Sequence, residues 1–249
     1  MVRKKMKKNL DFLKGIYIAH RGLYHNEKGI PENSIRAFKE AVKRNIPVEL
    51  DVHLLKDGNI VVFHDDNLNR MTGYNKMIKD CTYEEIRELR LLDTNEKIPL
   101  FEKVLQVIDG KVLIDIELKY DAERGKLETK LCSFLDNYKG KFIVKSFSPY
   151  IVRWFKKNRP EYIRGQLATD YKNEKSLGFI KRFIAKNMLY NFITKPDFIA
   201  YDLKALPNKR IERYRKKSYP ILIWTIRTYE ELKIAKQYGD SYIYEKIQV

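Results

Sequence analysis

Two periodicities of hydrophobic positions alternate along the chain. Short β-branched or aromatic runs, apolar throughout or at every second position, alternate with amphipathic stretches of helical period. The short runs predict strands at 16–20, 48–54, 112–119, 142–147, 163–168, 198–202, 221–226 and 241–245. The stretches between most of them predict helices at 34–44, 101–108, 126–137, 149–158, 176–192, 209–217 and 228–238.

This alternation predicts an α/β fold. No Gly/Ser-rich linker and no repeat of 20 to 50 residues divides the 249 residues, so we expect one large domain. Eight strands with seven intervening helices match a (β/α)8 TIM barrel, and a doubly wound sheet of this length would give much the same pattern.

One segment interrupts the rhythm directly after the second strand. The tetrapeptide Lys56-Asp57-Gly58-Asn59 precedes a short apolar run at 60–63, and tight Asp-Gly turns join antiparallel strands. We therefore expect a small inserted subdomain at about 56–99, with a helix of its own at 83–89. It is either a lid over a site or a decorated loop. The barrel domain is expected at 15–249, after a basic N-terminal extension at 1–14.

Composition narrows the choice of partners and compartment. The formal net charge of +17 predicts a surface that attracts phosphates, nucleic acid or anionic lipid. Two distant cysteines, Cys81 and Cys132, fit reduced thiols and give no zinc-ribbon spacing. No apolar run approaches the roughly 18 to 20 residues of a membrane-spanning helix. We expect a cytoplasmic protein, either soluble or peripheral at the inner membrane face.

The second predicted strand carries acidic residues at alternate positions. Side chains two residues apart share a face, so Glu49 and Asp51 point one way while Leu50 and Val52 point the other. In a barrel, helices cover the apolar outer face, which leaves both carboxylates directed inward. At roughly 7 Å between their stems, the two groups repel each other unless a cation lies between them.

The third barrel strand repeats this arrangement. Asp115, Glu117 and Lys119 alternate with apolar residues, so Glu117 can supply a third oxygen to the same cation and Lys119 can meet an anion. Hard oxygen ligands suit Mg²⁺ or Ca²⁺. The alternative is a buried network of carboxylates and lysine that only holds the barrel interior together.

All four histidines fall within the first 64 residues. His20 is expected at the carboxyl edge of the first strand, where barrel active sites lie, and Arg21 offers a planar cation for phosphate. His64 follows the run at 60–63, so a second imidazole could be brought opposite His20 as its partner in proton transfer. His25 and His53 lack such support, and we expect both to be structural.

Several short motifs follow one another in a fixed order. They are His20-Arg21-Gly22, Pro31-Glu32-Asn33-Ser34, Glu49-Leu50-Asp51-Val52, Lys56-Asp57-Gly58, His64-Asp65, Glu117-Leu118-Lys119, Ser146-Phe147-Ser148 and Trp224-Thr225. The ordered set covers nearly the whole chain and resembles the glycerophosphodiester phosphodiesterase family. The resemblance implies a barrel with an inserted subdomain, and metal-dependent hydrolysis of glycerophosphodiesters to sn-glycerol 3-phosphate and an alcohol.

The resemblance also implies roles for individual residues. These are a site for Mg²⁺ or Ca²⁺ formed by Glu49, Asp51 and Glu117, general acid and base catalysis by His20 and His64, and substrate binding by Arg21, Lys119 and Trp224. In the family's scheme the neighbouring glycerol hydroxyl attacks phosphorus, and water then opens a cyclic phosphate. The alternative is a lysophospholipase D or sphingomyelinase D type phosphodiesterase acting at a membrane surface.

Three positions depart from the family pattern, namely Ser34, Arg227 and Glu245. Ser34 stands where Thr is commoner, and Arg227 stands where the family often has Asn. At the last strand, Glu245 ends the tripeptide Ile-Tyr-Glu, where the family has a pattern like Ile-Thr-Asp. None removes an implied metal ligand or either histidine. The departures therefore concern substrate choice more than catalysis.

The basic segment 176–192 has two readings. Its apolar residues surround Lys181, Arg182 and Lys186, as in a helix lying in an anionic lipid interface, and an inward-packing barrel helix shows much the same pattern. No helix-turn-helix, zinc-finger or RNP motif supports nucleic-acid binding. The expected partners are a small glycerophosphodiester and, peripherally, an anionic membrane.

Overall fold

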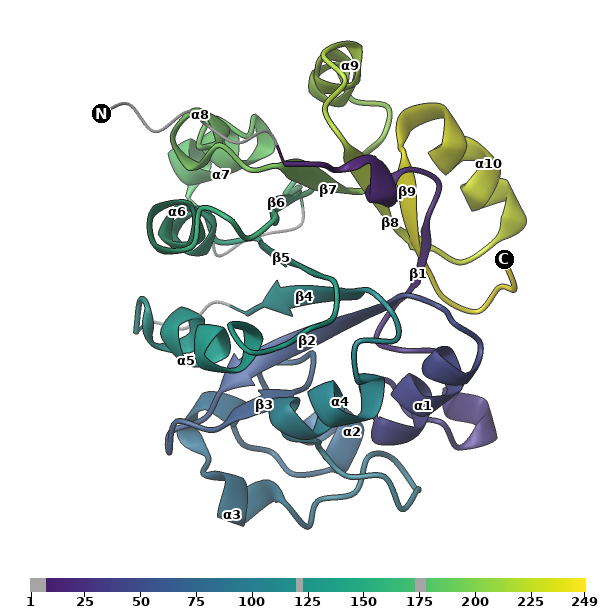
Figure 1. Ribbon diagram of the computed structural model, residues 1–249, viewed down its shortest axis with the longest axis vertical. Coiled ribbons are helices and arrows are strands. Elements are labelled where there is room, and N and C mark those ends of the chain that lie inside the picture. Colours follow the sequence, from purple (N-terminus) through teal and green to yellow (C-terminus); the bar gives the residue numbers. More distant parts are fainter. Residues whose placement is uncertain (1–7, 120–122, 173–177) are drawn as a thin grey trace.

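Eight parallel strands close into a barrel, and a ninth strand pairs with one of them outside it (Figure 1). The computed structural model describes residues 8–119, 123–172 and 178–249. The strands in these residues are β1 Tyr17–Ala19, β2 Val48–Leu54, β3 Ile60–Val62, β4 Ile114–Leu118, β5 Phe142–Ser146, β6 Arg164–Ala168, β7 Phe198–Asp202, β8 Ile221–Ile226 and β9 Ser241–Tyr244.

The order of the strands is β1-β9-β8-β7-β6-β5-β4-β2-β3. Parallel pairing of Ala19 in β1 with Val48 in β2 joins the two ends of the barrel. This closure confirms the predicted TIM barrel, because a doubly wound sheet keeps two open edges.

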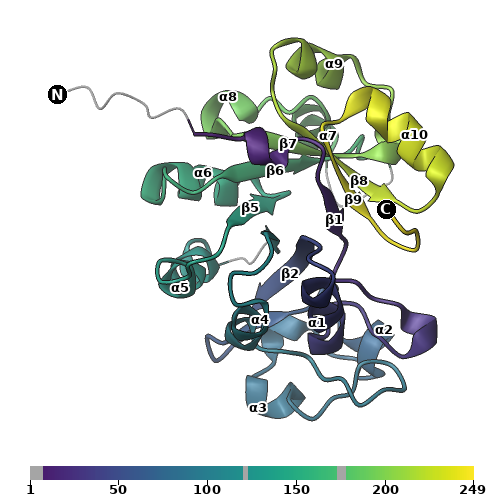
Figure 2. The same cartoon turned by 45° about the vertical axis from the view of Figure 1, so that its right-hand side comes forward.

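Most helices lie around the outside of the barrel, and two short ones belong to the inserted segment (Figures 1 and 2). They are α1 Ile35–Lys43, α2 Asn69–Thr72, α3 Tyr83–Ile86, α4 Phe101–Ile108, α5 Lys126–Leu135, α6 Pro149–Asn158, α7 Phe179–Lys186, α8 Asn191–Thr194, α9 Lys209–Lys216 and α10 Tyr229–Tyr238. Short 3-10 turns lie at Asp11–Leu13, Asn26–Lys28, Ile78–Asp80 and Leu203–Ala205. No helix in the described part of the chain is long and apolar enough to cross a membrane.

The prediction of one continuous helix at 176–192 was wrong. In the described part of this segment, α7 ends at Lys186 and α8 begins at Asn191. The backbone of Met188 adopts a left-handed φ of 49°, which an α-helix cannot accommodate. The side-chain amide of Asn187 donates to the carbonyl of Phe183, which satisfies one of the last carbonyls of α7. Ser176 lies outside the described residues.

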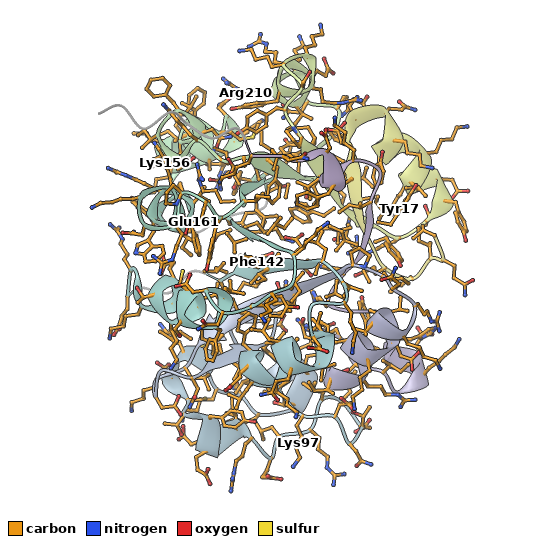
Figure 3. All side chains as sticks on the ribbon, in the orientation of Figure 1. Tyr17, Lys97, Phe142, Lys156, Glu161 and Arg210 are labelled. Carbon is orange, nitrogen blue, oxygen red and sulfur yellow. The ribbon has the colours of Figure 1, made fainter. Side chains whose placement is uncertain are left out.

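Side chains fill the space between strands and helices (Figure 3). On the outer face, Leu50 and Val52 of β2 belong to a core that includes Phe38 of α1 and Phe101 of α4. At the amino-terminal end of the strands, Leu13 packs against strand residues in a second apolar cluster. These apolar layers leave the polar residues of β2 and β4 inside the barrel.

The inserted segment follows β2 and forms a hairpin with it. Gly58, with φ of 81°, lies in the turn, and β3 runs antiparallel to β2 with Val62 opposite Val52. Buried residues such as Leu68 and Met71 give the insertion an apolar core of its own. Because β3 runs back along β2, the amide of Phe63 reaches the carbonyl of Asp51 at 3.0 Å, and His64 comes next to the barrel. The expected domain boundaries stay predictions.

Candidate active site

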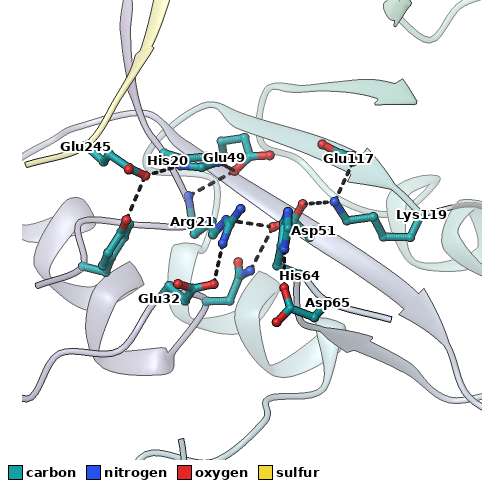
Figure 4. Close-up of polar contacts among 12 residues, drawn as sticks. His20, Arg21, Glu32, Glu49, Asp51, His64, Asp65, Glu117, Lys119 and Glu245 are labelled. Atoms are coloured by element: carbon teal, nitrogen blue, oxygen red, sulfur yellow. Dashed lines mark hydrogen bonds and ion pairs between the residues drawn. The ribbon is translucent and has the colours of Figure 1, made fainter. Parts of the chain in front are cut away.

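Three acidic side chains from two neighbouring strands converge inside the barrel (Figure 4). Glu49 and Asp51 come from β2 and Glu117 from β4, and the parallel register places Asp51 beside Glu117. One carboxylate oxygen of each residue lies within 4.8 Å of the others, and all three residues are buried. The alternation along the strands causes this convergence, because it sends every polar residue of β2 and β4 to the same side.

Lys119, directly after β4, bridges two of these carboxylates. Its Nζ atom lies 2.8 Å from Oδ1 of Asp51 and 2.7 Å from Oε1 of Glu117. Burial opposes the charged form of Lys119, yet the carboxylates prevail and raise its pKa above the ordinary value. Burial acts to raise the pKa of Asp51, but the positive charges of Lys119 and Arg21 hold it well below its usual range. The ammonium group thus lies between two carboxylates in the cluster.

A second lysine, Lys145 of β5, lies deeper in the barrel. Its Nζ atom is 2.6 Å from Oδ2 of Asp115 and 3.2 Å from Oε1 of Glu49. Although burial acts to lower it, these carboxylates raise the pKa of Lys145, which is therefore charged. Lys145 was not among the residues singled out from the sequence. It holds the carboxylate of Glu49 from the side of β5.

The donor atoms of this cluster test whether it fits a metal ion. Glu49, Asp51 and Glu117 present carboxylate oxygens, and Arg21, Lys119 and Lys145 lie against these carboxylates. An all-oxygen donor set fits a hard divalent cation. The carboxylate and lysine network considered as an alternative is also present, so the site combines both features.

His20 follows β1 at the carboxyl edge of the barrel. Its Nδ1 atom lies 2.5 Å from Oε2 of Glu245, and its Nε2 atom lies 4.0 Å from Oε2 of Glu49. Glu245 also accepts from the hydroxyl of Tyr24 at 2.8 Å and from Nε of Arg227 at 2.7 Å. Burial acts to raise the pKa of Glu245, but these donors lower it to about 2. An ionised carboxylate only accepts hydrogen bonds, so Nδ1 of His20 carries the proton.

His64 is held in a similar way by residues of the insertion. Its Nδ1 atom lies 2.6 Å from Oδ1 of Asp65. Arg70 of α2 pairs with Asp65 at 2.5 Å and with Glu32 at 2.7 Å, so it ties the insertion to the loop before α1. These donors lower the pKa of Asp65 below its ordinary value, although burial opposes the shift. The side chain of His64 keeps 34% of its surface exposed at the mouth of the barrel.

Arg21 faces carboxylates on two sides. Its Nη1 atom lies 2.5 Å from Oε1 of Glu32, its Nε atom lies 3.7 Å from Oδ2 of Asp51, and its backbone amide donates to Oε2 of Glu49 at 3.0 Å. Asn33 completes this side of the cluster, since its amide donates to Oδ2 of Asp51 at 3.0 Å. The Pro31-Glu32-Asn33-Ser34 motif therefore orients both Arg21 and a member of the acidic group.

Gly22 lies in close contact with helix α1. It has a φ of 79°, and a Cβ atom added to it would lie 3.0 Å from Cβ of Ala37 and 3.2 Å from Cδ1 of Phe38. The glycine therefore makes room for α1. This packing fixes the loop that carries His20 and Arg21.

Trp224 of β8 lies apart from the charged network. Its ring packs edge-on against Phe147 at 5.7 Å between centroids, and its Nε1–H has no hydrogen-bond partner among the described residues. A pocket of about 950 Å³ opens at this edge of the barrel, and its lining includes Phe147, Ser148, Gln166, Asp66 and Tyr171. Ser148 Oγ and Gln166 Oε1 are also buried without a hydrogen-bond partner in the described structure.

The structure therefore brings seven of the eight singled-out residues into one polar network, and Trp224 stands beside it. Sequence reasoning missed Lys145, Asn33, Glu32 and Arg70 as members of the site. Lys145 is the one charged residue in the strand Phe142–Ser146, and this position was the available signal.

Buried carboxylates and two imidazoles at the carboxyl edge of a (β/α)8 barrel are typical of a barrel enzyme, because active sites of this fold lie at that edge. Comparison with known proteins narrows this class. The model of the glycerophosphoryl diester phosphodiesterase family matches residues 20–244. The chain belongs to this family, and it is a phosphoric diester hydrolase that acts on glycerophosphodiesters.

Individual relatives agree with this placement. A glycerophosphodiester phosphodiesterase of Caldanaerobacter subterraneus subsp. tengcongensis is 36% identical over 168 residues, which are 62% of this chain and 67% of that protein. The putative glycerophosphodiester phosphodiesterase YhdW of Bacillus subtilis is 31% identical over 84% of this chain and 85% of its own.

Solved structures show the same architecture. The glycerophosphodiester phosphodiesterase of Thermotoga maritima superposes with a TM-score of 0.71 at 27% identity, over 92% of this chain and 93% of that one. A phosphodiesterase of Oleispira antarctica, in complex with the product sn-glycerol-3-phosphate, superposes with a TM-score of 0.78 at 22% identity, over 93% of both chains.

Proposed function

We propose that the chain releases sn-glycerol 3-phosphate and an alcohol from glycerophosphodiesters, with His20 and His64 as general acid and base. The product bound to the Oleispira antarctica phosphodiesterase supports the choice of product. The observation that carries the catalytic roles is the matching environment of the two imidazoles. Each one has its Nδ1 atom against a carboxylate, so Nε2 of each is the atom left for proton transfer.

A divalent cation, Mg²⁺ or Ca²⁺, would be held by Glu49, Asp51 and Glu117. When bound, such an ion supplies positive charge to the nonbridging phosphoryl oxygens. Arg21 and Lys119 border the same carboxylates and would bind the phosphate from the protein side.

In the reaction, one imidazole takes the proton from the attacking hydroxyl of the substrate's own glycerol as that oxygen bonds to phosphorus. The other imidazole gives a proton to the departing alcohol oxygen as its bond to phosphorus breaks. When water opens the resulting cyclic phosphate, the two imidazoles exchange these roles, so the enzyme ends in its starting protonation state.

Trp224 would line the pocket for the glycerol or alcohol. Its unpartnered Nε1–H supports this role, because a buried donor without a partner is costly unless a ligand or water accepts from it. The edge-on contact with Phe147 holds the indole in place at the rim.

A second candidate is a lysophospholipase D or sphingomyelinase D type activity. It is favoured by the apolar aromatic side chains of the neighbouring pocket, such as Phe147, and by exposed apolar residues beside it. Turnover of glycerophosphocholine and of lysophosphatidylcholine, measured side by side, separates the two activities. We also propose that the enzyme works in the cytoplasm, peripherally at the inner membrane face, where its net charge of +17 favours anionic lipid.

The proposed chemistry is tested by glycerol 3-phosphate release with and without a chelator. We expect the chelator, His20→Ala, His64→Ala and Glu49→Ala each to reduce turnover at least about 100-fold. His25→Ala is the matched control, because His25 is exposed and pairs with Ile30 and Lys28 through its backbone. Retained turnover in His20→Ala and Glu49→Ala would overturn the assignment.

A further inference from the structure

The segment 178–195, which contains α7 and α8, packs with its apolar side chains facing outward. Phe179 and Phe192 are each 85% exposed, Ile180 is 72% exposed and Phe183 is 54% exposed. No residue of α7 is buried, whereas the neighbouring helix α6 buries Ile151, Val152 and Phe155 against the barrel. A barrel helix ordinarily buries its apolar stripe, so this segment has the reverse arrangement.

The segment is nevertheless anchored firmly at its other side. Met188 is buried in the core around β7 and β8. The amide of Asn191 donates to the hydroxyl of Tyr214 at 3.3 Å, and the carbonyl of Ile193 accepts from Nζ of Lys156. These contacts fix the segment to α6 and α9, so its outward apolar side chains are part of a supported surface.

The surroundings of this apolar surface are strongly basic. Helices α6 and α7 each carry three basic residues and no acidic one, and α9 carries five basic residues and one acidic. Arg210 of α9 donates to the side chain of Asn187 at 2.9 Å, and Lys156 of α6 reaches Ile193, so both helices flank the segment (Figure 3). Basic helices on both sides of exposed phenylalanines are complementary to an anionic lipid surface, and they repel a second copy of the same face.

The surface also borders a pocket that reaches the loop after His64 and Asp65. Lys181 and Ala185 of α7 line this pocket together with Asp66 and Ser148. A surface that touches lipid through α7 therefore holds the opening of the pocket at the lipid headgroups.

We propose that residues 178–195 form a docking surface for an anionic phospholipid bilayer, with Phe179 and Phe192 inserting between the lipids and the flanking lysines and arginines contacting the headgroups. This inference rests on the proposed membrane location of the enzyme and not on the proposed chemistry. Docking delivers membrane-derived diesters to the site.

Retention on vesicles tests the proposal. We expect the protein to sediment with phosphatidylglycerol-containing vesicles at low salt, to be released in part at high salt, and to remain in solution with pure phosphatidylcholine. The double variant Phe179→Ser/Phe192→Ser should bind at least tenfold more weakly. Tyr229→Ser is the matched control, because Tyr229 is 61% exposed on α10, away from the segment, and it should bind as the wild type does.

Two further measurements separate the possible failures. Hydrolysis of soluble glycerophosphocholine should be unchanged in the double variant, so a failure of the proposed chemistry is seen independently of binding. If the wild type does not bind anionic vesicles, both the membrane location and the docking surface are wrong. If the double variant binds as tightly as the wild type, or if light scattering shows a wild-type dimer that the double variant abolishes, the surface is assigned wrongly.

Discussion

His20 and Glu245 face each other because each directly follows a pair of residues in register. Ala19 in β1 pairs with Tyr244 in β9, so the next residue of each strand emerges at the same edge of the barrel. Their side chains meet at 2.5 Å. Arg227, the other nearby departure from the family pattern, pairs with the same carboxylate at 2.7 Å. The two departures therefore support one another, and together they hold His20.

Removal of this carboxylate should slow catalysis without unfolding the protein. We expect Glu245→Ala to lower kcat on the order of 100-fold, because His20 loses the partner that fixes its proton on Nδ1. KM should change little, since the side chain of Glu245 is engaged by His20, Tyr24 and Arg227 and not by Arg21 or Lys119 in the described structure. Glu245→Asp should restore part of the rate, and Tyr229→Ser should leave it unchanged. Equal kcat in Glu245→Ala and wild type would show that Glu245 does not position His20.

Strand alternation made the acidic cluster predictable from the sequence. Once Leu50 and Val52 are assigned to the helix-covered face, Glu49 and Asp51 have no other direction than inward. The hairpin that returns His64 to the barrel was predictable from the Asp-Gly turn at 57–58. Both predictions depend on residues close together in sequence.

Contacts between distant strands could not be read in this way. Lys145 lies 96 residues from Glu49, and Glu245 lies 225 residues from His20. Only the order of strands around the barrel makes them neighbours. The sequence also could not predict which way the apolar face of α7 points. Its apolar period fits a helix whose apolar face is turned inward or outward, and only packing decides which face is covered.

Lys145 should be important for stability. Lys145→Met leaves the carboxylates of Asp115 and Glu49 buried without their cation, so we expect the free energy of unfolding to fall by about 3–5 kcal/mol. The double variant Lys145→Met/Asp115→Leu removes one of the two carboxylates left without a cation, and it should recover about 1–3 kcal/mol of this loss. Urea unfolding of the proteins, after metal has been removed with a chelator, measures the free energy of unfolding of both variants. A double variant less stable than Lys145→Met alone would contradict this account.

Acid should weaken the fold partly through Glu245. Its pKa in the folded protein is about 2, below the ordinary value of 4.5, so its contribution to stability is complete above pH 4.5 and is lost as the pH falls from 4.5 toward 2. After allowance for solvent screening, we expect Glu245→Gln to be about 1–2 kcal/mol less stable than wild type at pH 7. The difference should shrink below pH 4.5 in urea titrations at several pH values. A difference that stays constant down to pH 3 would assign the effect to packing.

Metal binding should be detectable without any measurement of activity. A ligand that binds only the folded state stabilises it by mass action, by about 2.7 kcal/mol when the free ion is 100 times its dissociation constant. We expect Mg²⁺ or Ca²⁺ to raise the melting temperature of the wild type from which metal has been removed with a chelator. The ion that gives the larger shift is the one that the carboxylates of Glu49, Asp51 and Glu117 bind more tightly. Glu49→Gln should lose most of the shift. Glu88→Gln, which changes an exposed carboxylate of the insertion, should retain it in full. Equal shifts in the two variants would place the ion elsewhere on the protein.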